Sequence, residues 1–241
     1  MKKFVLLLLP VSMLFASCLY FGGKKVKGNG HIETDERSVS SFHSVEVRGA
    51  IDVYVSQGAL QPVKIETDEN LLKYVEVEQH GEKVVIKNRH GYNIRPTQKV
   101  KVFVTSPDYR SLQVSGACNI IGQTKISTSE ALDLSVSGAG DIKMEVDAPK
   151  LSADISGSGT VDLKGQTKDF ELGLSGAGKA RCFEMLSENT EVDISGAGSA
   201  DVYASVKLDA EVSGAGSVKY KGNASNVNQQ VSGAGSVKKA D

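Results

Sequence analysis

A four-residue phrase, Ser-Gly-Ala-Gly with small variations, recurs seven times in the second half of this chain. The copies begin at Ser115, Ser137, Ser156, Ser175, Ser195, Ser213 and Ser232, so the numbers of successive serines differ by 22, 19, 19, 20, 18 and 19. Because a unit this short cannot bury an apolar face alone, neighbouring repeats must pack on one another. The repeat therefore constrains the fold more than any other feature of the sequence.

The residues that flank each copy alternate between apolar and polar. The positions one and three before each serine are apolar, apart from Gln229, and the position between them needs no burial. The fifth position after the serine is also apolar: Ile120, Ile142, Val161, Ala180, Ala200, Val218 and Val237. A period of two residues indicates β-strands. Each repeat thus supplies a strand, a bend and a second strand, and the chain is predicted to form an all-β, single-stranded β-helix (β-solenoid) with coils of about 19 residues. We expect a right-handed solenoid, because parallel crossovers are overwhelmingly right-handed.

The phrase itself is interpreted as a structural corner. Its glycines are expected to allow positive φ or close contact between coils, its alanine or Ser158 to fill a narrow interior, and its serines to form a ladder between coils. The predicted corner glycines are Gly138, Gly140, Gly157, Gly159, Gly176, Gly178, Gly196, Gly198, Gly214, Gly216, Gly233 and Gly235. A phosphate-binding loop needs a following helix, whereas every copy here is followed by a strand pattern. A calcium-binding roll has a different period, so neither ligand is expected.

Charged residues offer a separate indication of stacking. The sixth position after each serine reads Ile121, Lys143, Asp162, Arg181, Asp201, Lys219 and Lys238. The sign alternates at every step from 143 to 219. We expect these residues to form one outward column that helps to set the register of the coils.

The first eighteen residues have the order of an export signal. Lys2 and Lys3 precede an apolar run from Phe4 to Phe15, which ends in small residues and Cys18. The run is shorter than the roughly 20 residues that span a bilayer, which argues against an uncleaved anchor. The segment resembles a bacterial lipoprotein signal, so residues 1–18 are predicted to be a signal peptide with an acylated Cys18. An ordinary secretory peptide with an incidental cysteine is the alternative.

The remainder is divided into a tether and one domain. Residues 19–38, rich in glycine and lysine, are predicted to form a flexible tether. Residues 39–241 are predicted to form the β-helix domain, with longer irregular coils over 39–110 and regular repeat coils over 111–241. An early coil is expected around Gly49-Ala50. Strands are expected at 63–67, 75–78, 83–87 and 99–105, with a helical turn at 69–74; a small separate sheet over 63–105 is the alternative.

One segment is the best candidate for recognition. Exposed aromatic, basic and amide groups gather in a predicted recognition loop made of Arg89, His90, Tyr92, Asn93 and Arg95. The four histidines of the chain show no metal-ligand spacing, so no metal site or cofactor is predicted. Cys118 and Cys182 lie about three coils apart in the repeat frame, beyond disulfide reach. Cys182 aligns with apolar residues of other repeats and is expected to be buried.

The order of several short motifs is similar to that of a known family. These are Phe42-His43-Ser44-Val45-Glu46-Val47, Ile51-Asp52-Val53-Tyr54-Val55, Asp68-Glu69-Asn70-Leu71 and the serial corners. From about residue 39 to 238 the chain resembles the putative auto-transporter adhesins with a head GIN domain, common among Bacteroidetes lipoproteins. The resemblance implies a β-helical body and an adhesin function, and it supplies no catalytic residues.

These observations favour a cell-envelope lipoprotein without catalytic activity. We expect it to be exported, held in the outer membrane through lipid on Cys18, and to bind a glycan or protein ligand on a cell surface. Lys plus Arg total 28 against 29 for Asp plus Glu, so no overall charge draws the chain toward nucleic acid. A structural envelope component is the alternative function, and a polysaccharide lyase or hydrolase is the third. The repeat carboxylates alternate with Lys or Arg or stand singly in sequence, so no catalytic pair is predicted.

Overall fold

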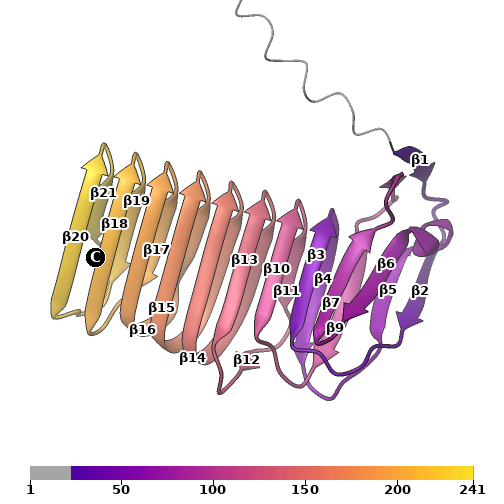
Figure 1. The fold of residues 1–241 in the computed structure, drawn as a ribbon, viewed down its shortest axis with the longest axis horizontal. Coiled ribbons are helices and arrows are strands. Elements are labelled where there is room, and N and C mark those ends of the chain that lie inside the picture. Colours follow the sequence, from indigo (N-terminus) through magenta and orange to yellow (C-terminus); the bar gives the residue numbers. More distant parts are fainter. Residues whose placement is uncertain (1–22, 241) are drawn as a thin grey trace, which may run out of the picture.

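The computed structural model describes residues 23–240 and shows a long β-solenoid of about six turns (Figure 1). The elements in chain order are β1 (Lys24–Lys27), β2 (Ile32–Arg37), β3 (Ser44–Gly49), β4 (Ile51–Gln57), β5 (Val63–Asp68), the 3-10 helix η1 (Glu69–Tyr74), β6 (Val75–His80), β7 (Lys83–Asn88), β8 (Tyr92–Arg95), β9 (Val100–Ser106), β10 (Ser111–Gly116), β11 (Asn119–Gly122), β12 (Ile126–Ser127), β13 (Leu132–Gly138), β14 (Asp141–Gly157), β15 (Thr160–Gly176), β16 (Lys179–Gly196), β17 (Ser199–Tyr203), β18 (Lys207–Gly214), β19 (Ser217–Lys221), β20 (Asn226–Gly233) and β21 (Ser236–Lys239).

The coils form two facing sheets. We call the sheet whose strands run into the Ser-Gly-Ala-Gly corners the leading sheet; it contains β3, β10, β13, the second halves of β14, β15 and β16, and β18 and β20. The trailing sheet, whose strands leave the corners, contains β4, β11, the first halves of β14 to β16, and β17, β19 and β21. Parallel strands of successive coils lie side by side in both sheets. The predicted stacking of coils is therefore confirmed.

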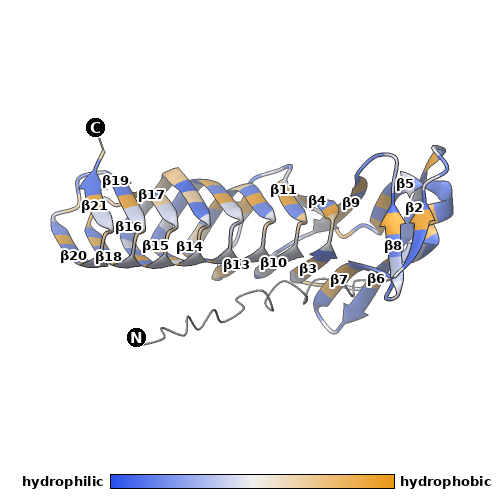
Figure 2. Ribbon diagram, turned by 90° about the horizontal axis from the view of Figure 1, so that it is seen from above, coloured by the Kyte–Doolittle hydropathy of each residue, from blue (hydrophilic) through white to orange (hydrophobic). Residues whose placement is uncertain are grey.

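The long strands pass from one sheet to the other at a bend in their middle. In β14 the even-numbered residues from Ile142 to Ala148 are buried, whereas after the bend the odd-numbered residues from Leu151 to Ile155 are buried. Pro149 and Lys150 are both exposed at the bend, which shifts the alternation by one residue. This shift turns the apolar side chains of both halves into the same interior. Figure 2 shows the alternation of hydrophobic and hydrophilic residues along the strands.

The register matches serine to serine along the whole repeat, and the structure accounts for the unequal spacings. Ser137 pairs with Ser156, and Ser156 with Ser175, with no offset. The longer step from Ser175 to Ser195 is absorbed by a β-bulge opposite the step from Asp162 to Lys164. The longest step, which follows Ser115, is absorbed between β11 and β13, where the short strand β12 lies.

Each corner divides the predicted glycine roles between its two glycines. The first glycine has positive φ, as in Gly176 at +113°, and the second, as in Gly178, is buried against the preceding coil. The predicted place of the alanine was wrong, because Ala177 and its equivalents are exposed, and the second glycine fills the narrow interior instead.

The corner serines lie on the outside of the coils. They are exposed, apart from the half-buried Ser115, and within residues 23–240 they form no hydrogen bonds with one another. The serines therefore stack in register, as the expected ladder requires, but no hydrogen bonds link them within residues 23–240.

The N-terminal part, residues 23–110, is more complex than a run of loose coils. Strands β7 and β9 pair in parallel with β3 and β4 and so continue the stack. Beyond them, β6 pairs antiparallel with β7, and β2 and β5 pair antiparallel with each other, with β5 also antiparallel to β9. We call this antiparallel end the head. The predicted strands and the helical turn are present at the expected residues, but the head combines both alternatives: continued coils and an antiparallel addition to the two sheets.

The predicted tether differs from the structure over much of its length. Strand β1 pairs in parallel with β8, and β2 pairs antiparallel with β5, so 24–27 and 32–37 are ordered parts of the head. Residues 1–22, which include the signal segment and Cys18, lie outside the described residues. Among residues 23–240 no helix is long and apolar enough to cross a membrane.

The interior between the sheets is a single apolar core that runs from Phe42 to Tyr220. Cys118 and Cys182 lie in it as free thiols, and the predicted burial of Cys182 is confirmed. Burial raises the pKa of Cys118 to about 11 and that of Cys182 to about 12, so both thiols are held in their protonated, weakly nucleophilic form.

Candidate binding surfaces

The predicted recognition loop lines a recess at the head. Residues 88–95 and the corner Gly49-Ala50 surround this recess, which has a volume of about 690 Å³. All five predicted residues of the loop contribute to its wall. The structure therefore brings the predicted loop together at one place on the surface.

Two of the five loop residues are also structural. The Tyr92 ring packs against Tyr74 with 4.6 Å between ring centroids. The Arg89 guanidinium donates from Nε to Glu76 Oε1 at 2.8 Å, and this hydrogen bond raises the pKa of Arg89. His90 and Arg95 are exposed, and Asn93 is half-buried. Within the described residues, the polar atoms of the loop best placed to meet a ligand are therefore those of His90, Asn93 and Arg95.

The outer surface of the leading sheet carries stacked carboxylates. We call it the acidic face, made of Asp133, Asp154, Asp169, Glu171, Glu191, Asp193, Asp209 and Glu211. Glu171 pairs in register with Glu191, and Glu191 with Asp209. The prediction that repeat carboxylates alternate with cations or stand singly was wrong on this sheet. Comparing the fourth position before each serine would have revealed the column from the sequence.

Only part of this negative charge is neutralised locally. Lys150 Nζ lies 2.6 Å from Glu171 Oε1, and Lys207 Nζ lies 3.6 Å from Asp209 Oδ2. Partial desolvation, followed by the charges of Asp133 and Glu171, raises the pKa of Asp154. Like charges in adjacent strands destabilise a sheet, so this arrangement is not explained by stability.

A second recess, of about 490 Å³, lies on the same face beside the stacked corner serines. Gly173 pairs in register with Asp154 on one side and with Asp193 on the other, so the missing side chain leaves a gap between two carboxylates. Ser156 and Ser175 also line the recess. The exposed lining of the recess is mostly apolar, and it also carries the hydroxyl groups of these serines and the carboxylates of Asp154 and Asp193.

The trailing sheet carries the predicted column of alternating charges. Lys143 pairs in register with Asp162, Asp162 with Arg181, and Arg181 with Asp201. Lys143 Nζ lies 3.3 Å from Asp162 Oδ2. The register confirms that these residues form one column, and their contribution to stacking stays a prediction.

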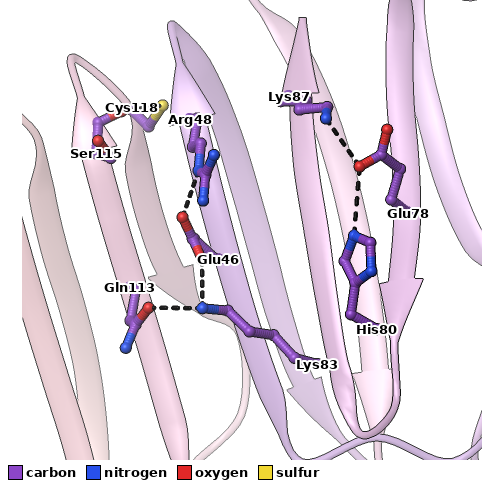
Figure 3. Close-up of polar contacts among 9 residues, drawn as sticks. All are labelled: Glu46, Arg48, Glu78, His80, Lys83, Lys87, Gln113, Ser115 and Cys118. Carbon is purple, nitrogen blue, oxygen red and sulfur yellow. Dashed lines mark hydrogen bonds and ion pairs between the residues drawn. The ribbon is translucent and has the colours of Figure 1, made fainter.

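A polar cluster on the leading sheet near the head was not identified from the sequence. Glu46, which is 8% exposed, accepts hydrogen bonds from Arg48 and Lys83, and Lys83 also donates to Gln113 Oε1 at 3.0 Å (Figure 3). Burial alone would raise the pKa of Glu46, but the hydrogen bonds and charges of Arg48 and Lys83 lower it overall. The cluster joins β7, β3 and β10, so its evident role is to tie together three adjacent parallel strands of the stack next to the head.

A second ion cluster lies beside it within the head. Glu78 accepts from Lys87 Nζ at 2.8 Å, and His80 Nε2 lies 3.5 Å from Glu78 Oε2 (Figure 3). Across residues 23–240, no group of three or more His, Cys, Asp or Glu side chains is arranged to hold a metal ion.

The fold and surfaces together define a two-sheeted β-solenoid that ends in an antiparallel head and displays charged columns. The chain belongs to the family described as putative auto-transporter adhesin, head GIN domain, whose model matches residues 41–224. No curated protein matches the chain.

Solved structures share this fold. A putative adhesin from Bacteroides fragilis is 20% identical with a TM-score of 0.82, and the match covers 89% of this chain and 100% of that one. A putative adhesin from Parabacteroides distasonis is 26% identical with a TM-score of 0.72, covering 90% and 100% of the two chains. A putative lipid binding protein from the same organism is 23% identical with a TM-score of 0.74, again covering 90% and 100%.

Proposed function

We propose that this chain is an exported, adhesin-like binding module of the cell envelope that is anchored through lipid on Cys18 and has no catalytic activity. The observation that carries the proposal is the unbroken parallel register from β7 and β9 to β20 and β21. Such a rod holds its outward side chains in fixed columns about 4.8 Å apart, which suits the binding of an extended or repetitive partner. Membership of an adhesin family supports the same function.

The acidic face is the surface on which we place ligand binding. It combines carboxylates that stack without full neutralisation with a recess next to the stacked corner serines. A partner with cationic or hydroxyl groups, such as a basic protein segment or a glycan, matches this chemistry.

The test compares cells that display the full chain with cells that display matched variants. One variant carries Asp154→Asn, Glu191→Gln and Asp193→Asn on the acidic face. Its control carries Asp141→Asn, Asp162→Asn and Asp201→Asn on the trailing sheet and removes the same number of charges. Binding of cells to arrays of glycans and host-surface proteins should fall only for the first variant.

Two results would contradict the proposal. Equal binding by cells with and without the chain would favour a structural role in the envelope. Turnover of an acidic polysaccharide by the purified chain, measured as new unsaturated or reducing ends, would favour the lyase or hydrolase alternative. The anchor is tested separately, by lipid labelling of the wild-type chain and of Cys18→Ala.

A further inference from the structure

Four exposed cations lie close to the start of the described residues. Lys25 and Lys27 on β1 share one face of the strand pair with Arg95 at the end of β8, and Lys24 on β1 lies on the other face. We call these four residues the basic strip. Strands β1 and β8 pair in parallel with Lys27 directly beside Arg95, and they form a two-stranded sheet that stands apart from the two main sheets (Figure 1).

The basic strip has no anionic partner among residues 23–240. None of its four side chains takes part in an ion pair there, and two carboxylates of this part of the chain have other partners. Asp68 accepts from Gly30 N at 2.7 Å and Thr97 N at 2.9 Å, and Glu76 is bound to Arg89. Like charges directly opposite one another across two strands are destabilising. The repulsion between the paired residues Lys27 and Arg95 therefore lowers stability, and a bound anion would reduce that repulsion.

The position of the strip indicates which anion is within reach. Lys24 lies six residues after Cys18. Six residues span at most about 22 Å when fully extended, so acylation of Cys18 would hold β1 within that distance of the lipid surface. Clusters of Lys and Arg next to a membrane attachment point are attracted to anionic headgroups, and the attraction falls off within a Debye length of about 8 Å.

We propose that the basic strip binds the phosphate groups of anionic lipids in the membrane that anchors the chain. This inference rests on the proposed anchor at Cys18 for its location. Tyr92 lies on the face of the strand pair that carries Lys24, and with Tyr74 it supplies amphipathic rings that favour a membrane interface. The strip turns the head toward the lipid surface. Because Arg95 belongs to both the strip and the recognition loop, that loop faces the anchoring membrane rather than a distant partner.

The experiment uses residues 19–241, which contain the whole described fold but lack Cys18 and the apolar run before it, so that only the protein surface can bind. Vesicles of phosphatidylcholine with about 30% phosphatidylglycerol are compared with pure phosphatidylcholine vesicles by co-sedimentation. We expect binding to the anionic vesicles only, with an affinity at least about tenfold weaker in 300 mM salt than in 30 mM salt. Replacing Lys24, Lys25 and Lys27 together with Gln should weaken binding about tenfold to a hundredfold.

The control replaces Lys219, Lys238 and Lys239 with Gln at the far end of the rod, which changes the net charge equally. It should bind as the parent does. Equal losses in the two variants would overturn the proposal, because binding would then follow net charge rather than the strip. Displacement by inorganic phosphate beyond its ionic-strength effect would assign the strip to a free anion instead, and binding to heparin without binding to vesicles would assign it to a soluble polyanion. Either result refutes the membrane contact while leaving the lipid labelling of Cys18 as a separate test of the anchor.

Discussion

Replacing the first corner glycine of a coil should destabilise the solenoid more than replacing the second. Gly176 has φ of +113°, and a Cβ built on it would lie 2.6 Å from the backbone oxygen of Gly157 in the preceding coil. A strained φ costs about 1–3 kcal/mol, and overpacking against a neighbour adds about 1–3 kcal/mol. Because the neighbour is backbone and cannot move alone, we expect Gly176→Ala to lower the free energy of unfolding by about 3–5 kcal/mol.

The second glycine meets a more adaptable neighbour. A Cβ on Gly178 would lie 2.6 Å from Ile155 Cγ2 and 3.1 Å from the Gly159 oxygen, and Gly178 has no positive φ. The Ile155 side chain can shift, so Gly178→Ala should cost about 1–3 kcal/mol, and the larger Gly178→Val should cost several kcal/mol. Lys179→Ser, at an exposed position beside it, should stay within about 0.5 kcal/mol of the parent.

Urea and thermal unfolding of the four variants would check this order. For a domain of this size we expect Gly176→Ala to lower Tm by about 6–20 °C. An unchanged unfolding curve for Gly176→Ala, or a greater loss for Gly178→Ala than for Gly176→Ala, would refute the division of roles between the two glycines. If the corner glycines instead served to bind a ligand, these substitutions would weaken ligand binding and leave Tm unchanged.

Cys18→Ala should abolish lipid labelling and move the chain from the membrane fraction to the soluble fraction; unchanged labelling would remove the anchor. Asp162→Lys should place a third positive charge next to Lys143 in the trailing column and cost about 1 kcal/mol, less at high salt, whereas a loss independent of salt would mean that the column is not electrostatic. Glu46 has a lowered pKa, so its contribution is present above its usual pKa of 4.5 and is lost as the pH falls through the folded-state value. Glu46→Gln should therefore be less stable than the parent by about 1–3 kcal/mol at pH 7, with the difference disappearing toward pH 3 in urea titrations. Asp154 has a raised pKa, so its ionisation opposes folding as the pH rises above 3.8. Because solvent screens this exposed carboxylate, the Asp154→Asn variant should be more stable than the parent by only a few tenths of a kcal/mol at pH 7. At pH 3 the two should be equally stable in the same urea titrations.

The regular part of the fold could be predicted because its information is local and repeated. Each coil restates the same alternation around the same phrase, so the register of Ser137 on Ser156 follows from aligning the copies. The roles within the corner could not be separated in this way, because both glycines and the alanine are small. Only the backbone path shows that Gly176 needs positive φ and that Ala177 points to solvent.

The head could be predicted only in part, because its pairings join segments that are distant in sequence. The strand at 24–27 has no partner nearby in the chain and is ordered by Tyr92–Arg95, which follows only after six further strands and η1. The residues of the recognition loop could be selected by type, but the recess that they line depends on the Gly49-Ala50 corner of another coil. The Glu46 cluster has the same origin, since Lys83 and Gln113 come from the two coils on either side.

The coil made of β3 and β4 lies between β7/β9 on one side and β10/β11 on the other, although it precedes both in the chain. Both neighbours must therefore add to edges that β3 and β4 already provide. A chain emerging from its N-terminus would first offer these two strands as a template and then extend it in opposite directions. Growth of the rod beyond β10 needs only contacts between successive coils, whereas closure of the head must bring β1 and β2 back to strands made later. We therefore expect the rod to acquire protection from hydrogen exchange before the head does, with β3 and β4 among the earliest strands protected.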